Sequence, residues 1–140
     1  MTAGAWIGLM SGTSLDGVDA VLARADDRGA LRGTAHVHHA FEPALRDELL
    51  ALNRSGPDEL HRAALATNAL MRSYAAAVRA LLAAGGQGAA GVQAIGAHGQ
   101  TVRHRPGEFD GTGYTLQLMN GALLAELTGI AVACDFRSRD

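Results

Sequence analysis

The sequence predicts an α/β protein with a mixed sheet, in which three antiparallel strands come first, parallel strands follow, and helices flank the sheet. Two observations lead to this prediction. Three short apolar or alternating segments joined by tight turns open the chain, and helical patterns then alternate with further short apolar segments. The 140 residues have the length of one domain.

The first three predicted strands are bounded by turn residues. Ala5–Met10 is a short apolar run that ends at the turn-forming sequence Ser-Gly-Thr-Ser. Residues 18–25 form the second predicted strand, and Asp-Asp-Arg-Gly at 26–29 is typical of a hairpin turn. Residues 31–41 form the third. Because the links are short, neighbouring strands are expected to run in opposite directions.

Two helices are predicted next. Residues 43–53 carry leucines at helical spacing, and Pro43 suits the first turn of a helix. A longer helical pattern covers residues 57–84, where apolar side chains follow one side and two glycines provide the stop. A break in this helix near Thr67 and Asn68 is an open alternative.

The rest of the chain predicts shorter elements. Further strands are predicted at residues 92–97, 114–118 and 130–134. Residues 103–113 are polar and rich in glycine, which indicates a loop or a wide hairpin turn. Asn120 is suited to cap a helix over residues 121–127.

Composition excludes several classes of function. Lysine is absent and all 12 basic residues are arginine, so P-loop, Schiff-base and pyridoxal-phosphate chemistry cannot reside on this chain. Cys134, the single cysteine, can form neither an internal disulfide nor a thiolate zinc site alone. A formal net charge of −2 argues against a nucleic-acid partner. Without a long apolar stretch or a secretory pattern, we expect no membrane partner and a cytoplasmic location.

One segment combines the residue types of a phosphate site. Its members are Gly12, Thr13, Ser14, Leu15, Asp16, Gly17, Val18 and Asp19. Consecutive main-chain N–H groups in a glycine turn can converge on an anion, and the Thr13 and Ser14 hydroxyls are further donors. Asp16 could hold a magnesium ion, directly or through water. The same residue types also make ordinary hairpin turns, which local composition alone favours.

The location of this turn in the chain favours a phosphate site over an ordinary hairpin turn. Actin, hexokinase and the heat-shock-protein ATPases place a phosphate-binding hairpin after the first strand of the same strand-strand-strand-helix order. Four segments then resemble, in order, blocks of the anhydro-N-acetylmuramic acid kinases of peptidoglycan recycling. They are GLMSGTSLDGVDAVL at 8–22, GAHGQTVRHRP at 96–106, LQLMNGALLAELTGIAV at 116–132 and DFRSRD at 135–140.

This resemblance implies a ribonuclease-H-like mixed sheet that forms the first lobe of an actin-like ATPase fold. It implies a kinase that uses ATP and magnesium to phosphorylate 1,6-anhydro-N-acetylmuramic acid while water opens the anhydro ring, giving N-acetylmuramic acid 6-phosphate. It also implies that residues 12–19 bind the ATP phosphates and that Asp16 holds the metal. Such a site needs no lysine, because phosphoryl transfer depends mainly on positioning and charge neutralisation.

A sugar site is expected where the later strands end, since open α/β sheets place ligands there. The candidate sugar contacts are His98, Gln100, Gln117, Asp135 and Arg137. Arg137 could grip the lactyl carboxylate of a muramic sugar through two N–H groups, with Asp135 orienting a hydroxyl or the arginine. Two alternatives stay open: His98 as a core histidine bonded to a carbonyl, and Asp135 with Arg137 as a structural ion pair.

Other residues are interpreted as structural, and two depart from the resembled patterns. His36 and His38 share one face of a strand, but no carboxylate or cysteine pattern accompanies them. Cys134 is expected to be buried and inert. Met10 stands where the related ATPases usually carry aspartate, and Met119 stands where the kinase family usually has glycine.

The resembled family is well over twice as long as this chain. We therefore expect residues 1–140 to be the N-terminal lobe of a two-lobed sugar kinase, with the second lobe and the water-activating aspartate beyond Asp140. No catalytic residue is then expected on this chain, and the chain alone is expected to be inactive. A homodimer is one oligomeric state that the full-length enzyme could adopt. The alternative function is a non-catalytic, truncated sugar-binding or interaction module.

Overall fold

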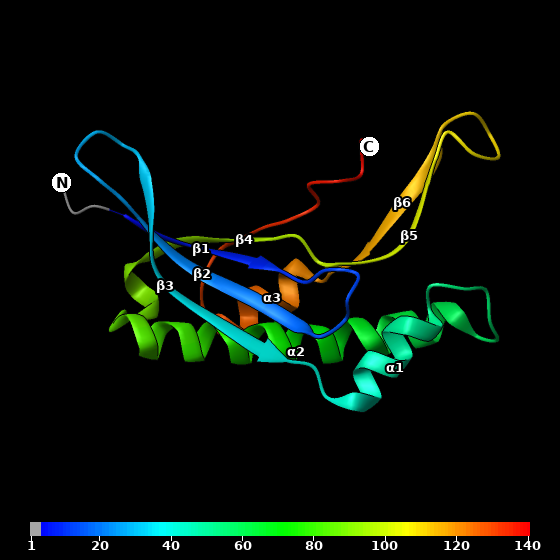
Figure 1. The fold of residues 1–140 in the computed structure, drawn as a ribbon, viewed down its shortest axis with the longest axis horizontal. Helices are drawn as coiled ribbons and strands as arrows, with labels where there is room; N and C mark the ends of the chain where they lie inside the picture. The colour runs from blue at the N-terminus through cyan, green and yellow to red at the C-terminus, as the bar shows by residue number, and fades with distance from the viewer. Residues whose placement is uncertain (1–3) are drawn as a thin grey trace.

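A computed structural model describes residues 4–140. The strands of its main sheet are β1 (Ala5–Met10), β2 (Gly17–Ala25), β3 (Leu31–Ala40), β4 (Val92–Ala97) and β7 (Val132–Ala133). Their order across the sheet is β3-β2-β1-β4-β7. The first three strands pair antiparallel, whereas β4 runs parallel to β1 and β7 parallel to β4 (Figure 1). The predicted mixed sheet is therefore confirmed.

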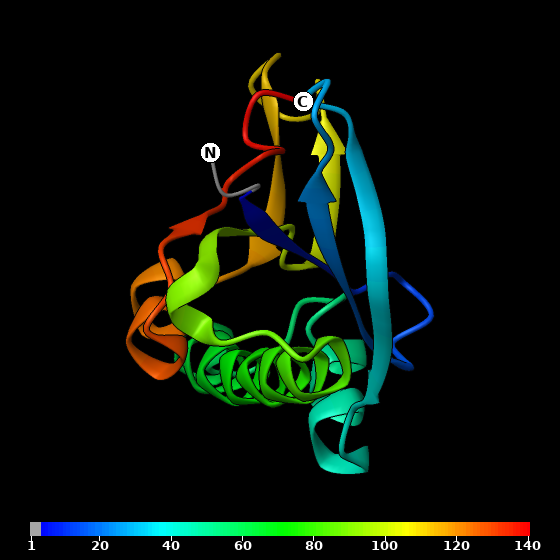
Figure 2. The ribbon, with the colours of Figure 1, turned by 90° about the vertical axis from the view of Figure 1, so that its left-hand side faces the viewer.

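Three helices cover one face of this sheet. They are α1 (Pro43–Ala51), α2 (Glu59–Gly85) and α3 (Gly121–Thr128), and a short 3₁₀ helix, η1 (Ala89–Gly91), leads into β4. Figure 2 shows the helices gathered below the strands of the main sheet. None of the helices within residues 4–140 has the length and apolar character needed to cross a lipid bilayer.

The core lies between α2 and the strands because β2 alternates regularly. Val18, Ala20 and Leu22 are fully buried, while Asp19 and Val21 on the opposite face are exposed. This period of two is what a strand with one covered face requires. The face of the sheet without the helices therefore carries the polar and exposed side chains of β2.

Helix α2 runs without a break. Thr67 lies inside it, and its hydroxyl donates to the Ala63 carbonyl oxygen at 2.7 Å, so this polar group is satisfied within the helix. The helix ends close against β2, since a Cβ atom on Gly85 would lie 2.6 Å from Leu22 Cδ2. Gly86 follows with a left-handed φ of +59°.

A two-stranded hairpin projects from the body of the molecule. Its strands are β5 (Gln100–Pro106) and β6 (Gly113–Leu118), which pair antiparallel in a separate sheet (Figure 1). Pairing extends through Pro106, so the turn covers residues 107–112 and the predicted loop at 103–113 is too long. The last strand is shorter than predicted, because only residues 132 and 133 of the 130–134 segment pair with β4.

Candidate functional site

The turn between β1 and β2 has the geometry of a compact, donor-rich loop. The Leu15 N–H donates to the Gly12 carbonyl oxygen at 3.2 Å, and Leu15 adopts a left-handed φ of +56°. Its side chain is nevertheless buried, so the core anchors this position. Thr13 and Ser14 are exposed between these two residues. The turn therefore presents hydroxyl groups to solvent while its base is fixed.

Buried polar residues hold the base of this turn. Ser11 Oγ lies 2.6 Å from Tyr74 Oη and donates to the Gly99 carbonyl oxygen at 3.4 Å. Gln100 Nε2 donates to the Gly12 carbonyl oxygen at 3.1 Å. Burial raises the pKa of Tyr74 to about 12, although its hydrogen bond to Ser11 acts in the opposite direction. The Tyr74 phenol therefore keeps its proton throughout the physiological range.

A crevice connects this turn to the carboxyl ends of the central strands. It has a volume of about 380 Å³. Its lining residues are Met10, Ser11, Gly12, Thr13, His98, Thr101, His104 and Arg137. The crevice thus brings part of the predicted phosphate segment together with two predicted sugar contacts.

A second, smaller cavity adjoins the crevice through His98. It has a volume of about 220 Å³. The residues around it are His98, Thr115, Leu116, Gln117, Met119, Cys134, Asp135 and Ser138. Cys134 is only partly buried there, so the prediction that it is buried was wrong. Its neighbour Asp135 has a left-handed φ of +65°, an uncommon conformation for a residue other than glycine.

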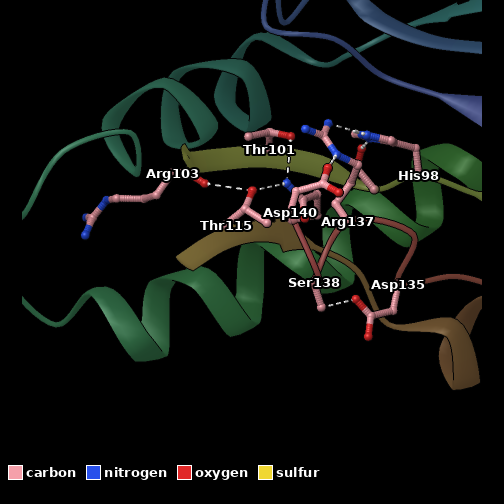
Figure 3. Close-up of polar contacts among 10 residues, drawn as sticks. His98, Thr101, Arg103, Thr115, Asp135, Arg137, Ser138 and Asp140 are labelled. Atoms are coloured by element: carbon pink, nitrogen blue, oxygen red, sulfur yellow. Dashed lines mark hydrogen bonds and ion pairs between the residues drawn. The ribbon is translucent and has the colours of Figure 1, made fainter. Parts of the chain in front are cut away.

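Arg137 and His98 are in contact between the two cavities (Figure 3). Arg137 Nη1 donates to His98 Nε2 at 3.4 Å, and His98 Nδ1 lies 3.0 Å from the Gly99 carbonyl oxygen. Because arginine has no acceptor, these partners assign the proton of a neutral His98 to Nδ1. Arg137 also forms an ion pair with Asp140, and Asp135 accepts a hydrogen bond from Ser138. The latter two contacts lie at the surface.

Gln117 and Gln100 lie in different environments. The amide of Gln117 donates to Thr101 Oγ1 on β5 at 3.0 Å and to Thr115 Oγ1 on its own strand at 2.8 Å. Its side chain lines the smaller cavity. Gln100 is fully buried, and its amide turns toward the phosphate turn. Its contact with a sugar stays a prediction, while its observed partners are the carbonyl oxygens of Gly12 in the turn and of Thr101 in β5.

Asp16 is a single exposed carboxylate in the turn. Its Oδ1 accepts from the Ser14 hydroxyl at 2.9 Å. Within residues 4–140, no group of three or more histidine, cysteine or acidic side chains is arranged to hold a metal ion. One carboxylate still fits Mg²⁺ when phosphate oxygens and waters complete the octahedron, which is the usual way this ion binds beside a nucleotide.

Asp19 lies apart from both cavities, on the exposed face of β2. Its Oδ1 is 3.1 Å from His36 Nε2 and 3.1 Å from His38 Nδ1. The expectation that no carboxylate accompanies these histidines was therefore wrong. Hydrogen bonding to His38, and then to His36, lowers the pKa of Asp19. The signal for this cluster is the β2–β3 register, which sets Asp19 opposite His38 and becomes visible only once the strands are paired.

Several cavity residues were not singled out from the sequence. Thr101 and His104 lie in a segment that one of the family blocks covers, so that block was the signal that could have found them. Tyr74 had no such signal, because it lies on the apolar side of α2, where a tyrosine is an ordinary core residue. Its hydroxyl partner lies 63 residues away in the sequence.

A mixed sheet that begins with three antiparallel strands, with a hydroxyl-rich turn facing a crevice after the first strand, is the first lobe of an actin-like ATPase fold. A sequence model of the family described as "Anhydro-N-acetylmuramic acid kinase" matches residues 4–140, so the chain belongs to that family.

Curated relatives carry the same name. The chain is 64% identical over 136 residues to the anhydro-N-acetylmuramic acid kinases of Variovorax paradoxus and Albidiferax ferrireducens. It is 63% identical over 135 residues to that of Bordetella petrii. These alignments cover 96% of the chain and 34 to 36% of the relatives. The chain thus spans about a third of the length of the curated relatives it matches.

Proposed function

We propose that this chain is the N-terminal lobe of a two-lobed kinase that phosphorylates 1,6-anhydro-N-acetylmuramic acid with ATP while water opens the anhydro ring. The product is N-acetylmuramic acid 6-phosphate, and the pathway is cytoplasmic peptidoglycan recycling. One observation carries this proposal: a single crevice is lined by Gly12 and Thr13 of the turn and by His98 and Arg137 of the sugar side. This is the arrangement that transfer between two bound substrates needs.

The turn supplies the ATP-phosphate contacts. Main-chain N–H groups and the hydroxyls of Thr13 and Ser14 bind phosphate oxygens, and Asp16 holds magnesium. The bound metal neutralises charge on the phosphates during transfer. Residues 17–19 continue the segment into β2, where Asp19 contacts His36 and His38.

The two cavities supply the sugar contacts. Arg137 retains N–H groups beyond those that face His98 and Asp140, and it binds the lactyl carboxylate. Gln117 and Asp135 line the smaller cavity and bind hydroxyl or acetamido groups. His98 holds Arg137 in place through its Nε2 atom.

The group that activates water is assigned to the second lobe, which follows residue 140 in this proposal, and the full-length enzyme is a candidate homodimer. The competing function is a non-catalytic sugar-binding or interaction module. A coupled assay of ADP release with the anhydro sugar separates the two. The full-length protein is expected to turn over the anhydro sugar, whereas the 140-residue chain alone is not. Robust turnover by the 140 residues would contradict the two-lobe assignment.

A further inference from the structure

Tyr74 and Ser11 form a buried polar contact between α2 and the end of β1. Both side chains are almost completely buried, and their oxygens are 2.6 Å apart. The single Ser11 hydroxyl proton is directed at the Gly99 carbonyl oxygen, so the Tyr74 O–H donates to Ser11 Oγ. The Tyr74 hydroxyl therefore links α2 to the end of β1. The Ser11 hydroxyl links the end of β1 to the loop between β4 and β5.

Gln100 forms a second link between the turn after β1 and the segment that follows β4. Its Nε2 atom donates to the carbonyl oxygens of Gly12 and Thr101, whereas its buried Oε1 atom has no partner among residues 4–140. A buried acceptor without a partner destabilises a protein. An apolar side chain at this position would avoid that loss of stability. The amide N–H groups of Gln100 are therefore the part of the side chain that has a role, which is to bind the Gly12 carbonyl oxygen.

The Gly12 carbonyl oxygen is the acceptor that joins Gln100 to the turn. It accepts from the Leu15 N–H, which closes the turn, and from Gln100, which reaches it from the sugar side. The 98–100 loop is itself closely packed on the end of β6, because a Cβ atom on Gly99 would lie 2.7 Å from the Leu118 carbonyl oxygen. The turn and the 98–100 loop are therefore held in one fixed relation.

We propose that Tyr74 and Gln100 are positioning residues that set the phosphate turn against the sugar-binding loop, through a turn clamp formed by Ser11, Gly12, Tyr74, Gly99 and Gln100. This inference rests on the proposed kinase function. Phosphoryl transfer is catalysed chiefly by positioning, and a displacement of about 1 Å can lower a rate about 100-fold.

Two variants remove the clamp with little change in shape. Tyr74→Phe deletes only the phenol oxygen, and Gln100→Met keeps side-chain length but deletes the amide. In the product of the complete reading frame, each is expected to lower kcat about tenfold and to change either KM less than kcat. Because Ser11 adjoins Gly12 and Gly99 adjoins Gln100, the two contacts hold the same two segments together, and the double variant is expected to lose far less than the product of the single losses. Full multiplicative loss would contradict a shared clamp.

Val78→Ala is the matched control. Val78 is buried on α2 one turn after Tyr74, and its truncation lowers stability without touching the clamp. The kcat of the Val78→Ala variant is expected to equal that of the wild type when both are assayed well below the melting temperature. If Tyr74→Phe and Gln100→Met behave in the same way, with lowered stability and unchanged kcat, the two residues are purely structural and the proposal is wrong.

Hydrogen exchange tests the clamp without any need for turnover. The Leu15 amide, which donates to Gly12, is expected to exchange several-fold faster in both clamp variants, while α2 amides near Val78 keep their wild-type rates. An unchanged exchange rate of the Leu15 amide in both variants would contradict the proposed turn clamp, even if kcat fell. Absence of turnover in the wild-type protein would instead contradict the proposed function, and exchange at Leu15 would still decide the clamp.

Discussion

Asp16 is the carboxylate of the phosphate turn that is free to meet a metal from solvent. Asp16→Asn removes its charge but keeps its shape, and it is expected to lower kcat of the complete kinase about 100-fold at limiting magnesium. Steady-state kinetics across a magnesium titration measure this effect. Asp27→Asn, an exposed change in the β2–β3 turn, is the control. Wild-type kinetics for Asp16→Asn at every magnesium concentration would remove it from the metal site.

Among residues 4–140, Arg137 is the only arginine that lines the crevice beside the turn. Arg137→Ala is expected to raise the KM for the anhydro sugar about tenfold or more, because a charged hydrogen-bond pair with the carboxylate is lost. An analogue without the lactyl carboxylate should be insensitive to the change. Arg139→Ala, on an exposed neighbour, serves as the control. Equal losses with both sugars would show that the carboxylate is not the partner.

At the residue scale, sequence reasoning identified the exposed polar groups better than the buried ones. Thr13, His98 and Arg137 could be singled out because polar residues at strand ends carry a signal, and all three line the crevice. Tyr74 could not, because only the packing of α2 on the sheet brings its hydroxyl to Ser11. Asp19 was placed with the phosphates, but its role beside His36 depends on cross-strand register.

The β5–β6 hairpin is attached to α2 by an ion pair at its base. Arg103 Nη2 lies 3.0 Å from Glu59 Oε2, which also accepts from the Gly56 N–H at 3.0 Å. Hydrogen bonding from Arg103, followed by that from Gly56, lowers the pKa of Glu59. The hydrogen bond to Glu59 raises the pKa of Arg103. The pair fixes the hairpin strands that carry Thr101 and Gln117.

This shift predicts a pH dependence of stability. Because the pKa of Glu59 is depressed on folding, its contribution is full above the ordinary glutamate pKa of about 4.3 and is lost as the pH falls through the folded value. Glu59→Gln is therefore expected to lower the melting temperature at neutral pH, and the difference from wild type should vanish in more acidic buffer. Glu108→Gln, at the exposed Arg105 pair, is the control. A difference that persists in acid would contradict this assignment.

Elements of the core were predictable, whereas the projecting hairpin was less so. β1 and β4 were predicted with their observed bounds, because each is a short apolar run followed by turn residues. β5 was not predicted as a strand, because Arg103 and Arg105 alternate with other polar residues, which gives no apolar period. The pairing of β5 with β6 comes from backbone hydrogen bonds and side-chain contacts across the hairpin, which periodicity does not encode.

At the scale of the whole molecule, the absence of lysine is consistent with the kind of phosphate site. The crevice offers main-chain groups, hydroxyls and one arginine, a donor set suited to a small anionic sugar and a nucleotide. The order of the four family blocks predicted the family, and the match over residues 4–140 confirmed it. Periodicity alone could predict the sheet and helices, but not the substrate, because a fold does not define its chemistry.

The central claim is transfer of phosphate to the anhydro sugar with opening of its ring by water. The most direct measurement is mass spectrometry of the product formed by the complete reading frame from ATP and 1,6-anhydro-N-acetylmuramic acid in oxygen-18 water. The product is expected to be heavier than the anhydro sugar by one phosphoryl group and one labelled water. A phosphorylated sugar that retains the anhydro ring, or an unmodified sugar, would contradict it.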